Sequence, residues 1–223
     1  MSIRKSAIDL SSELSPEELK AIQLLVRTNP MKGNHLEIGT AAGGTLRELM
    51  LCYSKPRPNF TVVDTFTYFP NQLELVKKNL IDAGLADEPV EFRKGYSWPL
   101  CAQAIMNDDS FEFIFIDGHH GYKHVMQDLR WTRMLKSGGY VCLHDYGPKF
   151  AGVIWAVERF LRKHRNYKKI SHNGTLVVLQ KIQSGKLEVS WVDVLAAALA
   201  SRISTFRTSL KKRLGRVGGF DQN

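Results

Sequence analysis

The sequence predicts an α/β fold built on a doubly wound, seven-stranded and mostly parallel sheet. Short apolar runs alternate with helix-length segments between residues 35 and 164, and this alternation implies right-handed crossovers between parallel strands. The run Phe111–Ile116 is largely apolar, as a central strand covered on both faces should be. Asn173-Gly174 lies between two further strand-like runs, which predicts an antiparallel hairpin near the end of the sheet.

The individual elements follow from local signals. Ser15 precedes Pro16 and two acids, which predicts a helix over about 15–28 with Ser15 as its N-cap. Ser137-Gly138-Gly139 is expected to end the helix at 122–135. Helices are also expected at 45–52, 71–83, 97–106 and 150–164. Strands are expected at 35–38, 60–64, 90–93, 111–116, 140–143, near 168 and at 175–179.

The bulk composition fits one domain with an appendage. The chain has 223 residues, 43% of them hydrophobic and 24% charged, which suits a domain over 1–181 with a substantial core. Its three cysteines form neither a C-x-x-C pair nor a disulfide framework, which suits a reducing compartment. The N-terminus lacks the apolar run of a signal peptide, and we therefore expect a cytoplasmic protein.

Residues 182–223 are expected to form a basic, amphipathic helical extension. Apolar residues recur every three or four positions from Trp191 to Leu214, and the pattern ends near Gly215. Two interpretations remain open for this helix: docking on its own domain or on another subunit, or peripheral attachment to an anionic membrane. We expect a homo-oligomer. The net charge of +9 could suggest nucleic acid, but no aromatic-basic RNA-binding module is evident, so no nucleic-acid partner is expected.

A glycine-rich turn follows the first predicted strand, over Glu37–Gly44. Its glycines let the backbone approach a ligand closely, with the N–H groups of the next helix directed at that ligand. The spacing is neither G-x-G-x-x-G nor a P-loop, which disfavours a dinucleotide or ATP. Asp64 closes the second strand, where a carboxylate suits ribose hydroxyls. Taken singly, each feature could also be an ordinary turn or helix cap.

Acidic and histidine residues follow two further strands. Asp117 and His120 come after the run at 111–116, and His144 and Asp145 come after the run at 140–143. Because ligands of open parallel sheets bind outside the carboxyl ends of the strands, these groups can converge on one ligand. The simpler alternative is that Asp117 belongs to a turn and that His120 shares a hydrogen-bonded helix face with residues 124 and 128.

With these residues identified, the chain resembles the class I S-adenosylmethionine-dependent methyltransferases over about residues 30–181. The loop E-x-G-x-x-x-G-G, Asp64 and the C-terminal hairpin match the sheet of that family. More narrowly, FIFIDGHHGYKHVMQDL followed by LKSGGYVCLHD is similar to the macrocin O-methyltransferase group, and the catechol O-methyltransferases are more distant relatives. The resemblance implies the Rossmann-like fold of these enzymes.

The resemblance also implies a set of site residues. The cofactor S-adenosyl-L-methionine would contact Glu37, Gly39, Thr40, Gly43, Gly44, Asp64, Tyr96, Ser97 and Asp117. A divalent cation, Mg²⁺ or Mn²⁺, would be bound by Asp117, His144 and Asp145, although the family usually has an acidic residue at position 144. His120 falls where the group has its general base.

The chemistry of these groups suits transfer to oxygen. An alcohol or phenol is a poor nucleophile until it loses its proton, which a metal and a nearby imidazole both promote. We therefore expect a metal-assisted O-methyltransferase that acts on a small hydroxylated molecule, such as a sugar or a phenolic compound. The alternatives are a non-catalytic protein used for cofactor sensing or assembly and, with less support, an RNA methyltransferase.

Overall fold

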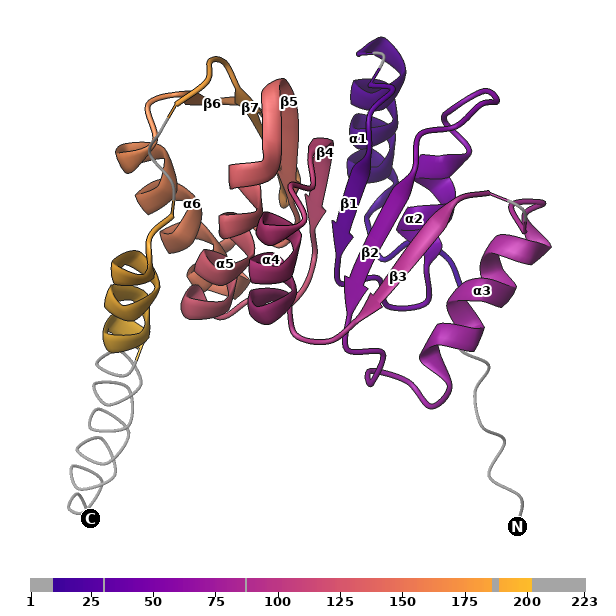
Figure 1. Cartoon of the computed structure of the whole chain (residues 1–223), viewed down its shortest axis with the longest axis horizontal. Helices are drawn as coiled ribbons and strands as arrows, with labels where there is room; N and C mark the ends of the chain where they lie inside the picture. The colour runs from indigo at the N-terminus through magenta and orange to yellow at the C-terminus, as the bar shows by residue number, and fades with distance from the viewer. Residues whose placement is uncertain (1–9, 30, 87, 186–188, 202–223) are drawn as a thin grey trace, which may run out of the picture.

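The computed structural model has a central seven-stranded sheet with helices on both faces (Figure 1). The structure describes residues 10–29, 31–86, 88–185 and 189–201. The strands are β1 (His35–Ile38), β2 (Phe60–Asp64), β3 (Val90–Lys94), β4 (Phe111–Ile116), β5 (Leu135–Leu143), β6 (Tyr167–Asn173) and β7 (Leu176–Lys181). The helices are α1 (Pro16–Thr28), α2 (Gly44–Met50), α3 (Gln72–Asp82), α4 (Ser97–Met106), α5 (Tyr122–Asp128) and α6 (Ala151–Lys163), with short 3-10 segments η1 (Leu129–Met134) and η2 (Pro148–Phe150).

The sheet confirms the predicted fold class. Its strand order is β3-β2-β1-β4-β5-β7-β6, and the first five strands of the chain pair in parallel. Strand β7 is antiparallel to both β5 and β6. The predicted hairpin is therefore present, and its turn lies at Gly174 (φ +58°). The order in which successive strands are added to the sheet reverses between β1 and β4, and α/β sheets bind ligands at such switch points.

Two apolar clusters, one on each face of the sheet, form the core. Ile114 and Ile116 of β4 pack in a cluster with α4, α5 and α6, whereas Phe113 and Phe115 pack in a cluster with α1, α2 and α3. Because successive side chains of a strand point to opposite faces, β4 supplies both clusters. Figure 1 shows α4 and α5 in front of the sheet and α1 behind it.

Helix α1 begins where the sequence predicts. The Ser15 hydroxyl accepts a hydrogen bond from the backbone N–H of Glu18 at 3.3 Å, and the Glu18 carboxylate accepts one from the backbone N–H of Ser15 at 2.9 Å. Pro16 occupies the first helical position, where its missing N–H costs no hydrogen bond. This reciprocal capping box satisfies two N–H groups that the helix cannot satisfy internally.

The prediction of one helix over 122–135 was wrong. Helix α5 ends at Asp128, the chain continues as the 3-10 segment η1, and β5 already begins at Leu135. Leu135 is buried and pairs with Phe111, so its side chain belongs to the sheet core. The glycines at 138 and 139 were expected to end a helix, but they lie inside β5, beside a register irregularity in the pairing with β4.

The described part of the C-terminal extension is helical from 191 to 201. Val194 and Ala197 are buried against the cluster of α4, α5 and α6, whereas Leu195 and Leu199 of the predicted apolar stripe are exposed. The remainder of that stripe, from 203 to 214, lies outside the described residues. Within the described ranges, no helix combines the length and the apolar character needed to cross a membrane.

Candidate active site

The glycine loop between β1 and α2 packs directly on the end of β4. Gly39 has φ +81°, and a Cβ atom placed there would lie 2.4 Å from the carbonyl oxygen of Asp117. Its N–H donates to the carbonyl of Val63 at the end of β2. Only glycine combines this backbone conformation with so close an approach. The loop therefore brings the ends of β1, β2 and β4 together at one edge of the sheet.

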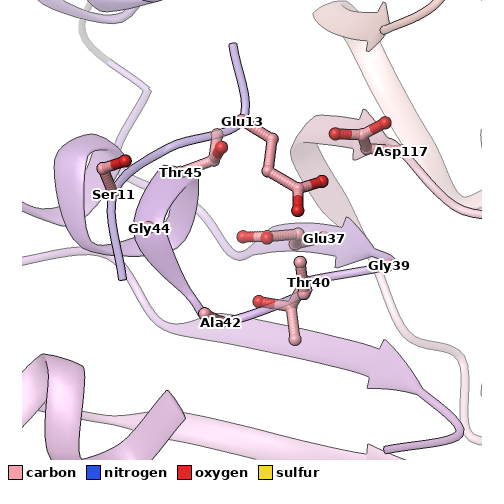
Figure 2. A pocket seen from close by; sticks show the side chains of 10 residues that line it. Ser11, Glu13, Glu37, Gly39, Thr40, Ala42, Gly44, Thr45 and Asp117 are labelled. Atoms are coloured by element: carbon pink, nitrogen blue, oxygen red, sulfur yellow. The ribbon is translucent and has the colours of Figure 1, made fainter. Parts of the chain in front are cut away.

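A pocket that is open to solvent lies at this edge (Figure 2). It is lined by Ser11, Glu13, Glu37, Gly39, Thr40, Ala41, Ala42, Gly44, Thr45 and Asp117. Two of the buried side-chain atoms in its wall, Glu37 Oε2 and Thr40 Oγ1, have no hydrogen-bond partner among the described residues. Because buried polar atoms are normally paired, these two mark a place where a polar ligand can bind.

Glu37 is 2% exposed, and its burial raises the pKa of the carboxyl group to about 8. The nearby negative charges of Asp117 and Asp64 act in the same direction. A cation bound in the pocket would favour the charged carboxylate, because opposite charge counteracts the cost of desolvation. The environment of Glu37 thus suits a ligand that carries positive charge.

Asp64 fastens the glycine loop to the end of β2. Its Oδ2 accepts a hydrogen bond from the backbone N–H of Thr40 at 3.0 Å, and its Oδ1 accepts one from the N–H of Phe66 at 2.6 Å. The carboxylate is half-buried beside the loop, so it keeps a side open to a ligand. These hydrogen bonds to backbone N–H groups give Asp64 a structural role even without a ligand.

Tyr96 and Ser97 lie at the beginning of α4, after β3. Tyr96 is 72% exposed, whereas the Ser97 hydroxyl accepts a hydrogen bond from the indole N–H of Trp131 at 2.9 Å. Asp128 of α5 lies on the same side and is 5% exposed. Burial raises its pKa to about 7, although its hydrogen bond with Ser97 acts against this rise. Ser97 is thus held by two buried partners.

Asp117, His120 and Asp145 come together beside the pocket. One possible ligand atom from each of them lies within 4.8 Å of the other two, a spacing that fits one metal ion. His120 Nε2 is 2.8 Å from Asp145 Oδ2, and Asp145 has the left-handed backbone conformation, φ +58°. Asp117 also lines the pocket. The two strand ends therefore converge, as the sequence predicts.

His144 lies beside the two carboxylates with which it was expected to share a metal ion. Its Nδ1 lies 3.1 Å from Asp117 Oδ1 and 3.8 Å from Asp145 Oδ2, and its Nε2 lies 3.5 Å from Oε2 of Glu18. Burial lowers the pKa of His144, but the hydrogen bond with Asp117 and the charges of Asp117, Asp145 and Glu18 raise it to about 9. The imidazole is therefore held among three carboxylates, and its role as a metal ligand stays a prediction.

Sequence reasoning missed two acids of this region, Glu13 and Glu18. Glu13 precedes α1 and lines the pocket, and Glu18 is 4% exposed and contacts His144. The local pattern identifies Glu18 only as the acid of a capping box. No signal within a few residues of either acid indicates that the N-terminal segment packs on the edge of the sheet.

Comparison with known proteins identifies the family. Residues 36–146, which run from β1 to the residue after Asp145, match the family described as Methyltransferase domain. The matched residues belong to this methyltransferase family, and the chain has the fold of the class I S-adenosylmethionine-dependent methyltransferases. No curated protein matches the sequence.

Solved structures of methyltransferases share this fold. The O-methyltransferase from Bacillus cereus, solved with SAH, has 20% sequence identity, a TM-score of 0.59 and coverage of 76% of this chain and 83% of its own. TomG from Streptomyces achromogenes, an O-methyltransferase involved in tomaymycin synthesis and solved with SAM, has 17% identity, a TM-score of 0.61 and coverage of 76% and 82%. At these sequence identities the similarity shows a shared fold and does not identify the methyl acceptor of this chain.

Proposed function

We propose that this methyltransferase transfers a methyl group from S-adenosylmethionine to a hydroxyl oxygen of a small molecule, assisted by a divalent cation. The observation that carries the proposal is the position of Asp117. It lines the pocket beside the glycine loop and also belongs to the group formed with His120 and Asp145. A donor in the pocket and an acceptor beside the three side chains would therefore meet at one residue.

The pocket supports binding of the donor. Gly39 and Gly44 let the backbone come close to a ligand, and the unpaired atoms of Glu37 and Thr40 offer it polar contacts. We assign Asp64 to the ribose and Tyr96 with Ser97 to the border of the adenine. Further contacts are assigned to Gly43, Thr45 and the backbone near Asp117.

The donor set of Asp117, His120 and Asp145 fits a divalent cation. Two carboxylates and one imidazole suit Mn²⁺ and Fe²⁺ as well as Mg²⁺, for which oxygen ligands are preferred. When bound, such an ion lowers the pKa of an acceptor hydroxyl and holds the oxygen in place. We assign His144 a supporting role, because its two ring nitrogens face Asp117 and Glu18 and can hold these carboxylates in place.

The pairing of His120 with Asp145 also supports proton removal. A carboxylate 2.8 Å from one ring nitrogen fixes the orientation of the imidazole. When His120 does not bind the metal ion, its other ring nitrogen, Nδ1, can accept the proton of the acceptor hydroxyl. The Phe150 ring lies 4.2 Å from the His120 ring, between centroids, and provides an apolar wall for a flat acceptor.

Both the structurally similar proteins and the site itself indicate the class of methyl acceptor. The B. cereus and S. achromogenes proteins are O-methyltransferases, and the latter is involved in tomaymycin synthesis. A phenolic or carbohydrate hydroxyl suits the aromatic wall that Phe150 forms beside His120. We therefore propose a small hydroxylated acceptor.

Binding and transfer experiments test the proposal separately. Calorimetry should detect S-adenosylmethionine binding without metal, and electron paramagnetic resonance should detect Mn²⁺ binding that Asp145→Asn abolishes. The matched control is Asp82→Asn, an exposed acid paired with Lys78 at the end of α3, which should leave Mn²⁺ binding unchanged. With tritium-labelled donor and a panel of catechols, flavonoids and nucleotide sugars, His120→Ala should reduce methyl transfer roughly 10²–10⁴-fold.

The results separate the main alternatives. A chain that binds neither S-adenosylmethionine nor Mn²⁺ would contradict the proposal and favour a non-catalytic role. Methyl transfer that is unaffected by a metal chelator would remove the cation from the mechanism and leave the His120–Asp145 pair as the base.

A further inference from the structure

The segment that precedes α1 is fastened across the glycine loop and the first turn of α2. The side-chain amide of Asn79 donates a hydrogen bond to the carbonyl of Leu10 at 2.7 Å and another to the carbonyl of Ala42 at 2.9 Å. The Ser12 and Thr45 hydroxyls are 2.7 Å apart and share a hydrogen bond. Residues 10–14 are therefore anchored to the loop that forms the pocket.

Gly44 is shaped for this segment. A Cβ atom at position 44 would lie 2.1 Å from the carbonyl oxygen of Ser11, which no real contact allows. The glycine at the beginning of α2 thus admits the backbone of the N-terminal segment. The segment is consequently part of the pocket wall, and Ser11 and Glu13 are among the residues that line it.

Glu13 extends from this segment over the pocket. Figure 2 shows its carboxylate pointing down toward Glu37, with Asp117 nearby on the neighbouring strand end. Among the residues that line the pocket there are three carboxylates and no Lys, Arg or His. A site with this electrostatic character recognises a positively charged ligand.

We propose that Glu13 is a cofactor-binding residue that accepts a hydrogen bond from the α-ammonium group of S-adenosylmethionine. This inference rests on the proposed use of that donor. The ammonium group carries N–H donors, so it can form charge-assisted hydrogen bonds with a carboxylate. The sulfonium has no hydrogen to donate and needs only a favourable field. Glu13 therefore recognises the amino-acid end of the cofactor.

The contact between Glu13 and the ammonium group would also affect the N-terminal segment. Because the carboxylate is carried by residues 10–14, ligand binding would tighten the attachment of this segment to α2 and α3. The contact is the same for S-adenosylmethionine and for its product S-adenosylhomocysteine, because both keep the ammonium group. It is absent for methylthioadenosine, which has the adenosine and the thioether but no amino-acid end.

These three compounds test the inference by calorimetry on the full chain. Glu13→Gln keeps the size of the side chain and removes its charge. It should weaken binding of S-adenosylmethionine and S-adenosylhomocysteine by about tenfold or more, and it should leave methylthioadenosine unchanged. The control is Glu17→Gln, an exposed acid in the first turn of α1, which should change none of the three affinities.

Each other result overturns the inference. Equal weakening of all three compounds would mean that Glu13 only positions the segment, and unchanged affinities would mean that it does not contact the ligand. Failure of the unmodified protein to bind S-adenosylmethionine at all would instead reject the proposed donor, so the two failures are distinguishable. Thermal melting of Glu13→Gln checks that the variant is folded.

Discussion

The carboxylate of Glu18 in α1 lies 3.5 Å from the imidazole of His144 at the end of β5, measured from Oε2 to Nε2. Its other oxygen accepts hydrogen bonds from the backbone N–H and the hydroxyl of Thr175, beside the β6–β7 turn. The same side chain closes the capping box with Ser15. One buried acid therefore joins helix α1, the hairpin and the candidate site.

Replacing Glu18 should destabilise the fold strongly. Glu18→Ala leaves the buried N–H of Thr175 without its acceptor and removes a negative partner from His144, so the free energy of unfolding should fall by about 3 kcal/mol. Urea unfolding at neutral pH measures this. Glu17→Ala, in the same turn but exposed, should stay within about 0.5 kcal/mol of the unmodified protein. Equal losses for both variants would contradict the role of Glu18.

The close contact between Gly39 and Asp117 predicts a second difference. Gly39→Ala combines a left-handed backbone with a Cβ 2.4 Å from a carbonyl oxygen, whereas Gly84→Ala has φ +73° and no atom within 4 Å of the added Cβ. The Gly84 variant should lose about 1–2 kcal/mol of unfolding free energy from backbone strain alone. Gly39→Ala should lose at least about 3 kcal/mol and weaken cofactor binding. Similar losses would show that the loop can move away from β4.

The elements that position the site could be predicted because their signals are local. The strands at 35–38 and 111–116 have the predicted bounds, since apolar runs between turn residues leave little choice of boundary. Asp117 and Asp145 converge because parallel strands end at the same edge of the sheet. The end of a strand can therefore be predicted from its apolar run. The parallel topology then predicts that side chains just after neighbouring strands lie close together.

The directions of individual side chains could not be predicted. His120 and His144 both follow strand ends, yet His120 pairs with Asp145, whereas His144 lies between Asp117 and Glu18. Asp145 has a left-handed backbone and Glu18 is buried, and neither feature has a local signature in the sequence. Glu18 and Thr175 are 157 positions apart, so no periodic pattern relates them.

The buried carboxyl of Asp128 predicts a pH dependence of stability. Burial raises its pKa to about 7, well above the value near 3.9 of an unfolded chain. Between these values the folded state binds more protons than the unfolded state, so this group lowers stability as pH rises from 4 to 7. Asp128→Asn keeps the size of the side chain and removes the charge that is buried at high pH.

The Asp128→Asn variant should therefore be more stable than the unmodified protein at pH 8, by about 3 kcal/mol, and nearly equal to it at pH 4. Urea unfolding at both pH values measures the difference. Parallel pH profiles for the two proteins would show that the pKa of Asp128 does not change on folding. A loss of stability at every pH would show that the hydrogen bond with Ser97 requires a carboxylate.

The docking of the helix at 191–201 depends on one buried acid. Asp193 is 3% exposed, contacts both Arg159 and Lys163 of α6, and accepts a hydrogen bond from the Ser190 hydroxyl at 2.8 Å. Burial opposes its ionisation, but Lys163, Ser190 and Arg159 hold the pKa of this carboxyl well below its usual range. The ion pairs therefore fix the start of the extension to α6.

Removing this acid should release the extension without unfolding the domain. Asp193→Ala leaves two partly exposed cations of α6 without their shared partner. A loss of about 1.4 kcal/mol or more should make the released state at least tenfold more populated. Amide hydrogen exchange within residues 191–201 should accelerate in proportion, because exchange follows the population of the open state. Asp82→Asn, an exposed acid on α3, should leave the rate unchanged. An unaltered rate in Asp193→Ala would mean that Val194 and Ala197 hold the helix by apolar contact alone.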